Sequence, residues 1–162
     1  MPASTTKLMT AYLALKYGDL DEEVVITKTA QDIPIDSSRA GLRVGDRIVL
    51  FDLLHGLLLP SGNDAALAIA EHISGSVEEF VSLMNEEAKL LGATNTQFVN
   101  PHGYQDENHF TTAYDLYLMF DACMKQPEFL NIISKPSYDL EITQQNGTYR
   151  DEKWLQSNWY VN

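Results

Sequence analysis

Apolar residues recur at intervals of three and four positions along much of this chain, and this period predicts a mainly helical protein. The first such stretch follows Ser4 and ends at Gly18, and the second runs from Asp52 to Pro60. Three further stretches begin near residues 63, 76 and 112. We expect the helices that begin near residues 63 and 76 to form part of the core.

Polar residues mark the expected starts of the later helices. Asn63 or Asp64 is predicted to cap the third helix, because short polar side chains accept hydrogen bonds from free backbone N–H groups. Ser76 and Thr112 each precede an acidic residue by three positions, which is the spacing of a capping box. The last of these helices carries four apolar residues at helical spacing: Leu116, Met119, Phe120 and Cys123.

Three short segments instead favour strands. Residues 24–27 and 47–50 are rich in β-branched residues and are bounded by turn formers. From residue 138 to residue 142 apolar and polar residues alternate, and Asn146-Gly147 follows as a strong hairpin signal. The chain is therefore predicted to be α+β, with more helix than strand.

Composition and charge narrow the classes of function. The chain has 162 residues and 44% are hydrophobic, which suits one folded domain or one lobe of a larger domain. The net charge of −12 opposes binding to nucleic acid or to an anionic membrane surface. A single cysteine, Cys123, excludes an internal disulfide and a thiol cluster. No metal or cofactor is predicted, because none of the four histidines has the paired spacing of a zinc site: His55, His72, His102 and His109.

Ser4 and Lys7 are the first candidate functional residues. They lie three positions apart at the expected start of the first helix, so their side chains share one helical face. An amine in that position can take the proton of the hydroxyl and activate it as a nucleophile. The pair alone has a bland alternative, since serine favours helix starts and lysine is usually a solvated charge.

A second motif, Ser61-Gly62-Asn63, places a hydroxyl and an amide in the turn between two predicted helices. A helix-start S-x-x-K followed by S-x-N is the arrangement found in penicillin-recognising serine enzymes. The chain resembles the D-alanyl-D-alanine carboxypeptidases, the low-molecular-mass penicillin-binding proteins, over nearly its whole length. The resemblance rests on these two motifs and their flanks, and on two further stretches: Phe98-Val99-Asn100-Pro101-His102-Gly103 and Thr111-Thr112-Ala113-Tyr114-Asp115-Leu116.

The resemblance implies a role for each motif residue. Ser4 would be the nucleophile that is acylated, and Lys7 the base that activates it. Ser61 would relay a proton to the leaving D-alanine, and Asn63 would hold the amide carbonyl of the substrate. The backbone N–H of Ser4 would supply one donor to the tetrahedral oxyanion. We interpret Asn100, His102 and Thr112, which also lie in matching stretches, as turn and cap residues.

The resemblance also implies a fold, partners and a location. The expected fold is that of the penicillin-binding transpeptidases and β-lactamases, with an incomplete antiparallel sheet. The expected substrate is a peptidoglycan stem peptide ending in D-Ala-D-Ala, with β-lactam antibiotics as covalent inhibitors. We expect the enzyme to work outside the cytoplasm, on the outer face of the bacterial cytoplasmic membrane or secreted, with membrane association only through regions absent from this sequence.

The family that this chain resembles carries a third motif, Lys-Thr-Gly on a strand, and no Lys-Thr-Gly occurs in this sequence. The four lysines after Ser61 are Lys89, Lys125, Lys135 and Lys153. The chain stops at Trp159-Tyr160-Val161-Asn162, before the place of that strand in relatives. We therefore expect residues 1–162 to be a single partial domain, the helical lobe, with the flanking strands largely missing and turnover impaired.

Two other functions remain open at this point. A β-lactamase shares S-x-x-K and needs an extra carboxylate to hydrolyse its acyl-enzyme, for which Glu86, Glu87 or Glu107 is a candidate. A non-catalytic lobe that only binds peptidoglycan is the second alternative.

Overall fold

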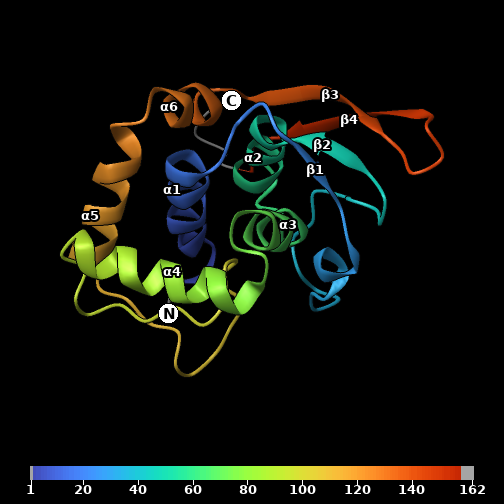
Figure 1. Cartoon of the computed structure of the whole chain (residues 1–162). Helices are drawn as coiled ribbons and strands as arrows, with labels where there is room; N and C mark the ends of the chain where they lie inside the picture. Colours follow the sequence, from blue (N-terminus) through green and yellow to red (C-terminus); the bar gives the residue numbers. More distant parts are fainter. Residues whose placement is uncertain (1, 158–162) are drawn as a thin grey trace.

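Helices and strands occupy separate sides of the structure (Figure 1). The computed structural model describes residues 2–157, and within them six α-helices pack beside a four-stranded antiparallel sheet. The helices are α1 (Lys7–Tyr17), α2 (Leu50–Leu58), α3 (Asn63–Ser74), α4 (Val77–Leu90), α5 (Ala113–Met124) and α6 (Pro127–Ile133). Two 3-10 turns precede them or lie between them, η1 (Ala3–Thr6) and η2 (Lys28–Gln31). The predicted α+β class with a majority of helix is confirmed.

The sheet has the strand order β1-β2-β3-β4, with β1 (Glu23–Val25), β2 (Arg47–Val49), β3 (Ser137–Thr143) and β4 (Tyr149–Leu155). All neighbours are antiparallel, and Arg47 of β2 faces Thr143 of β3. The expected hairpin joins β3 to β4, and Gly147 in its turn has a φ of 80°. That backbone conformation is one that glycine adopts without a steric cost.

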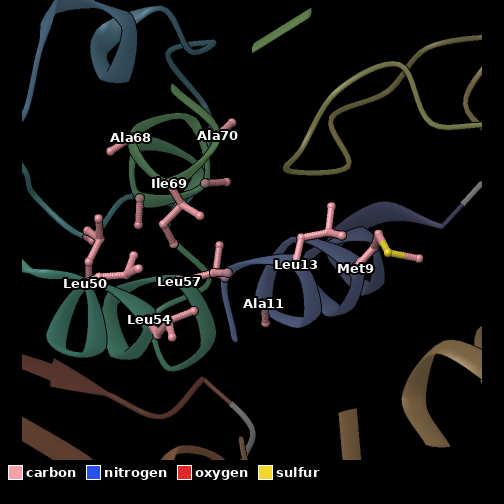
Figure 2. Packing of buried hydrophobic residues seen from close by; sticks show 14 of the residues in the cluster. Met9, Ala11, Leu13, Leu50, Leu54, Leu57, Ala68, Ile69 and Ala70 are labelled. Carbon is pink, nitrogen blue, oxygen red and sulfur yellow. The ribbon is translucent and has the colours of Figure 1, made fainter. Parts of the chain in front are cut away.

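The core lies where α1, α2 and α3 meet (Figure 2). Leu13 of α1, Leu57 of α2 and Ile69 of α3 are fully buried, and Figure 2 shows Ile69 pointing from α3 towards α2. Trp154 ties the sheet to these helices, because its indole N–H donates to the Ala40 carbonyl at 2.7 Å and its ring lies against Gly56 of α2. The helices that carry the candidate motifs are therefore held by a common core.

Two of the predicted helix starts are confirmed. The Ser76 hydroxyl accepts a hydrogen bond from the Glu79 N–H at 3.1 Å, and the Thr112 hydroxyl accepts one from the Asp115 N–H at 3.1 Å. In both cases the helix begins at the next residue. These caps satisfy backbone donors that the first helical turn leaves free.

The predicted cap of α3 is wrong. Gly62 occupies the cap position and makes no side-chain cap, while Asn63 and Asp64 lie within the first turn. Their side chains are used in contacts with residues distant in sequence, which no local rule anticipates. The second helix also begins earlier than expected, at Leu50 rather than Asp52, because β2 passes directly into α2.

Helix α6 was not predicted, because its 7 residues are too few to show a helical period of apolar residues. Pro127 at its first position is typical of a helix start. The terminal residues Trp159, Tyr160, Val161 and Asn162 lie outside the described part of the chain. Within residues 2–157 we find no helix with the length and hydrophobicity of a membrane span.

Candidate active site

Ser4, Lys7 and Ser61 line one cavity of about 540 Å³. The cavity lies between η1, the start of α1, the loop that joins α2 to α3, and the helices α5 and α6. Its other wall residues are largely apolar: Thr5, Leu8, Leu57, Leu58, Phe120, Phe129, Ile133, Gln156 and Ser157. The structure therefore brings together the hydroxyl, the amine and the second hydroxyl that the sequence singled out.

Ser4 lies on the short 3-10 turn just before α1, and its side chain is exposed. Ala3, the residue before it, has a φ of 48°, which is uncommon for a residue with a Cβ atom. The turn is supported from outside by Gly103, where an added Cβ would lie only 1.8 Å from the Ala3 carbonyl oxygen. The backbone that carries Ser4 is thus held in a strained conformation by a close neighbour, as is common at functional sites.

Lys7 is the first residue of α1 and is 3% exposed. Its amine donates to Asn63 Oδ1 at 2.7 Å and to the His102 carbonyl oxygen at 3.0 Å. Burial lowers the pKa of Lys7 to about 8, although the charge of nearby Asp64 raises it in part. Because burial disfavours the charged ammonium, this amine loses its proton more easily than a lysine in water.

Ser61 and Gly62 form the sharp turn between α2 and α3. Ser61 has a φ of 60°, and its buried hydroxyl has no hydrogen-bond partner within residues 2–157. A Cβ on Gly62 would meet the Gly56 carbonyl oxygen at 2.7 Å and Ala40 at 2.9 Å, so only glycine fits. The turn therefore leaves Ser61, a residue of the cavity wall, with a buried and unpaired hydroxyl. Both the positive φ and the unpaired hydroxyl are destabilising, and such features are common at functional sites.

Asn63 contacts Lys7 but is not among the residues that line the cavity. It is 6% exposed, and its backbone N–H donates to the Ser38 carbonyl at 2.9 Å. The neighbouring Asp64 is 2% exposed and accepts four backbone hydrogen bonds, from Ala65 and from the loop at residues 40–42. Asp64 thus fixes the start of α3 against that loop and places a negative charge near Lys7.

The segment at residues 100–103 binds the polar side of α1. Thr10 donates to the Pro101 carbonyl at 2.6 Å, one turn along α1 from the bond between Lys7 and His102. His109 Nδ1 accepts from the Val99 N–H at 3.1 Å, so its Nε2 carries the proton that it donates to the Thr6 hydroxyl at 2.7 Å. These bonds hold the turn that carries Ser4 and the amine of Lys7 against one loop.

Asn100 and His102 make the turn contacts expected of them. Asn100 Oδ1 accepts from the Gly103 N–H at 2.7 Å, and His102 Nδ1 accepts from the Tyr104 N–H at 3.1 Å. Burial is the main cause that lowers the pKa of His102 to about 4, and the nearby charge of Lys7 adds to it. His102 is therefore neutral at pH 7, and its carbonyl rather than its ring faces the amine of Lys7.

None of the three glutamates nominated for a β-lactamase lines the cavity. The Glu87 carboxylate is bound by Lys16 at 2.9 Å and by the Tyr17 hydroxyl, while Glu86 and Glu107 are exposed. Within the described residues no three histidine, cysteine or acidic side chains gather in a group that would hold a metal.

Three contributions to the site were not anticipated from the sequence: the Asp64 carboxylate, the space left by Gly103, and the carbonyl of His102. Asp64 and Gly103 lie within or beside the quoted motifs, so their position was a signal, but the loop residues that they contact lie 22 or more positions away. The contact of the His102 carbonyl could not be predicted, because every residue has a backbone carbonyl whatever its side chain.

Comparisons with known proteins agree with this geometry. The sequence profile of the D-alanyl-D-alanine carboxypeptidase family matches residues 1–162. The carboxypeptidase DacF of Bacillus subtilis is 37% identical over 99% of this chain and 40% of its own length. DacD of Escherichia coli is 38% identical over 90% of this chain and 40% of its own length. The chain thus spans about two fifths of these curated relatives.

Solved structures show the same similarity. The Streptomyces K15 DD-transpeptidase matches with a TM-score of 0.93 and 32% identity, over 99% of this chain and 65% of that protein. Penicillin binding protein 6B from Escherichia coli matches with a TM-score of 0.85 and 34% identity, over 99% of this chain and 51% of that protein.

Proposed function

This chain belongs to the D-alanyl-D-alanine carboxypeptidase family, and from that premise we propose that it removes the terminal D-alanine of peptidoglycan stem peptides through an acyl-enzyme on Ser4. The observation that carries the proposal is the buried amine of Lys7, which has a pKa of about 8 and shares a cavity with two serine hydroxyls. A serine hydroxyl is a weak nucleophile at neutral pH, so it needs such a base.

In the first step the Ser4 hydroxyl gives its proton to Lys7 while Oγ bonds to the carbonyl carbon of the scissile peptide bond. A neutral amine has two N–H groups and one lone pair, and here two donor directions are taken by Asn63 and His102. We propose that the remaining lone pair accepts the proton of Ser4. We propose that the Ser4 N–H at the helix start stabilises the oxyanion that forms.

In the second step the C–N bond breaks and the leaving nitrogen of D-alanine takes a proton. We propose that Ser61 relays this proton from Lys7, because its buried hydroxyl has no other partner in the described structure. Water then hydrolyses the ester and restores Ser4. A penicillin acylates Ser4 in the same way through its β-lactam carbonyl. Asn63 accepts a hydrogen bond from Lys7 through Oδ1, and its NH2 group would donate to the amide carbonyl of the substrate.

We also propose that residues 1–162 form one unit, the helical lobe of the family's catalytic domain, and that the reaction takes place outside the cytoplasm, where peptidoglycan is found. These residues hold no Lys-Thr-Gly. The family resemblance implies that the strand with Lys-Thr-Gly supplies the second donor to the oxyanion. We propose that the segment alone is acylated slowly, since loss of one oxyanion donor typically lowers turnover by about 10²–10³.

Intact-mass spectrometry with excess benzylpenicillin tests the proposal. We expect one covalent penicillin per chain, no adduct on Ser4→Ala, and an unchanged adduct on Ser82→Ala, a control at an exposed serine of α4. No adduct on the parent after prolonged incubation, or an adduct that persists on Ser4→Ala, would refute the assignment. Accumulation of hydrolysed penicillin in large excess over enzyme would favour a β-lactamase instead.

Release of D-alanine separates an enzyme from a binding lobe. We expect a peptide ending in D-Ala-D-Ala to release D-alanine with the parent and not with Ser4→Ala, while the L-Ala-L-Ala peptide stays intact. Equal binding of the D-Ala-D-Ala peptide by both proteins, with no release by either, would favour a non-catalytic lobe.

A further inference from the structure

The outward face of α5 carries a row of exposed rings. Tyr114 is 67% exposed, Tyr117 60% and Phe120 42%, and these residues are three positions apart. The opposite face of the helix is buried against α1 and the core, through residues that include Met119 and Cys123. Figure 1 shows α5 at one edge of the helical layer. Within residues 2–157 the exposed faces of these rings are not covered by other side chains, and such patches usually mark binding sites.

The row is continuous with the candidate active site. Phe120 lines the same cavity as Ser4 and Lys7. Phe129 of α6 supports Phe120 from within, at a ring-centroid distance of 6.3 Å and in a T-shaped arrangement. A ligand that lies along Tyr114 and Tyr117 would therefore reach the cavity at Phe120.

The Tyr114 and Tyr117 rings form an exposed aromatic platform. Their ring centroids are 6.3 Å apart and their planes differ by 33°, so one ligand can contact both rings. Residues three apart advance roughly 4.5 Å along a helix axis, which spaces the rings regularly. Each ring offers an apolar face and a phenol, and neither phenol has a hydrogen bond within the described residues. This combination suits a ligand with C–H faces and many hydroxyl groups.

The charges of the chain disfavour an anionic ligand at the row. Asp121 of α5 and Lys125, the residue that follows the helix, form an ion pair at 2.6 Å that adds no net charge. The chain as a whole carries −12, which disfavours an anionic lipid surface.

We propose that Tyr114 and Tyr117 bind the glycan strand of peptidoglycan by stacking on its N-acetylated sugars, and so deliver the attached stem peptide to Ser4. The inference rests on the proposed function, because continuity with that cavity selects a glycan over another ligand. It places the sugar chain along α5 and the peptide in the cavity beyond Phe120.

Cosedimentation with purified insoluble peptidoglycan tests the inference without needing turnover. We expect the double variant Tyr114→Ala/Tyr117→Ala to bind at least fivefold more weakly than the parent, while its rate of acylation by benzylpenicillin changes by less than twofold. Tyr149→Ala removes a tyrosine of similar exposure, 65%, on the distant hairpin and should bind like the parent. Tyr114→Phe/Tyr117→Phe should retain most of the binding, because stacking needs only the rings.

Three results would overturn the inference: unchanged binding by the double alanine variant, an equal loss for Tyr149→Ala, or binding to vesicles of anionic lipid that depends on the two tyrosines while peptidoglycan is not bound. Failure of penicillin to acylate the parent would instead refute the proposed function. Circular dichroism of each variant distinguishes loss of the platform from loss of the fold.

Discussion

The amine of Lys7 is subject to two opposing influences. Burial lowers its pKa to about 8, and the Asp64 carboxylate partly raises it. The rate of acylation by penicillin should therefore rise about tenfold per pH unit below 8 and level off above it, as the amine becomes neutral. Stopped-flow measurement of acylation from pH 6 to 9.5 tests this prediction.

Lys7→Arg should lower the acylation rate by a factor of roughly 10²–10⁴, since a guanidinium keeps its proton. Lys16→Arg should keep the rate, and a flat profile in the parent would contradict the role of Lys7.

The carboxylate of Asp64 yields a second prediction. In Asp64→Asn the influence that raises the pKa of Lys7 is removed, so the midpoint of the acylation profile should move to lower pH. Unfolding free energy should fall by about 1.5–3 kcal/mol, because charge-assisted backbone bonds are lost. Asp46→Asn is the matched control, because Asp46 is also 2% exposed and binds the Arg43 N–H and Arg150, but is not among the groups that shift the pKa of Lys7. An unmoved midpoint in Asp64→Asn, or an equal shift in Asp46→Asn, would refute this coupling.

Among single residues, the spacing of Ser4 and Lys7 is local information and predicted that they are neighbours, whereas Ser61 was placed beside them only by the family resemblance. All three line one cavity. The sequence misjudged Asn63 and Asp64. Both have the chemistry of cap residues, yet Asn63 binds an amine 56 positions away and Asp64 binds a loop about 24 positions away. Whether such a side chain caps its own helix or binds a distant residue depends on which residues the fold brings near it.

Among the elements, the loop at residues 100–103 determines the conformation of the turn that carries Ser4. Gly103 has a φ of 84°, and a Cβ there would overlap the Ala3 carbonyl. Gly103→Ala should lower the unfolding free energy by more than about 2 kcal/mol and should slow acylation, because the backbone at Ala3 must move to make room for the added Cβ. Gly147→Ala is the control, with a φ of 80° and no atom within 4 Å, and should cost only about 1–2 kcal/mol. Denaturant melts and acylation rates measure both, and equal effects would contradict the prediction.

Helices with a strong terminal signal were predicted well. Ser76 and Thr112 cap as expected because their hydroxyls have no competing partner in the described structure. The short helix α6 was missed, since its 7 residues are too few for a period to emerge. Phe120 belongs to the apolar spacing of α5, yet it faces the cavity. Spacing alone does not separate a core face from a binding face.

At the scale of the whole molecule, a polar cluster fastens the hairpin to the helices. The His55 ring stacks on Tyr138 of β3 at 3.6 Å, Lys135 donates to its Nε2 at 3.2 Å, and the Tyr138 hydroxyl donates to Asp52 of α2 at 2.6 Å. His55 Nδ1 carries a proton and donates to the Phe51 carbonyl at 2.9 Å. The ring is therefore held in its neutral form between two elements.

This cluster predicts how stability depends on pH. Burial lowers the pKa of His55 to about 4, as it does for His102, whereas an unfolded histidine titrates near 6.5. Between these values the unfolded chain binds protons that the folded chain excludes, so stability is complete above about 6.5 and declines towards pH 4, by up to about 3 kcal/mol per histidine. Urea titrations at pH 7.5 and 4.5 should show a smaller difference for His55→Gln than for the parent. An identical difference would contradict the prediction.

The overall fold could be predicted from the sequence, because the motifs occur in the same order as in the family that the chain resembles. The expected penicillin-binding transpeptidase fold is confirmed by a TM-score of 0.93 to a family structure. The order of the strands was not predicted, since the contact of β2 with β3 joins segments about 96 residues apart at a single pair, Arg47 and Thr143.

The candidate site is formed by three segments, residues 3–10, 61–64 and 100–109. Hydrogen bonds join each segment to another one. A partly unfolded chain does not keep Lys7 beside both Asn63 and His102. Labelling by a fluorescent penicillin would therefore report native molecules alone, and the intensity of a labelled gel band would measure the folded fraction of any variant before other assays are interpreted.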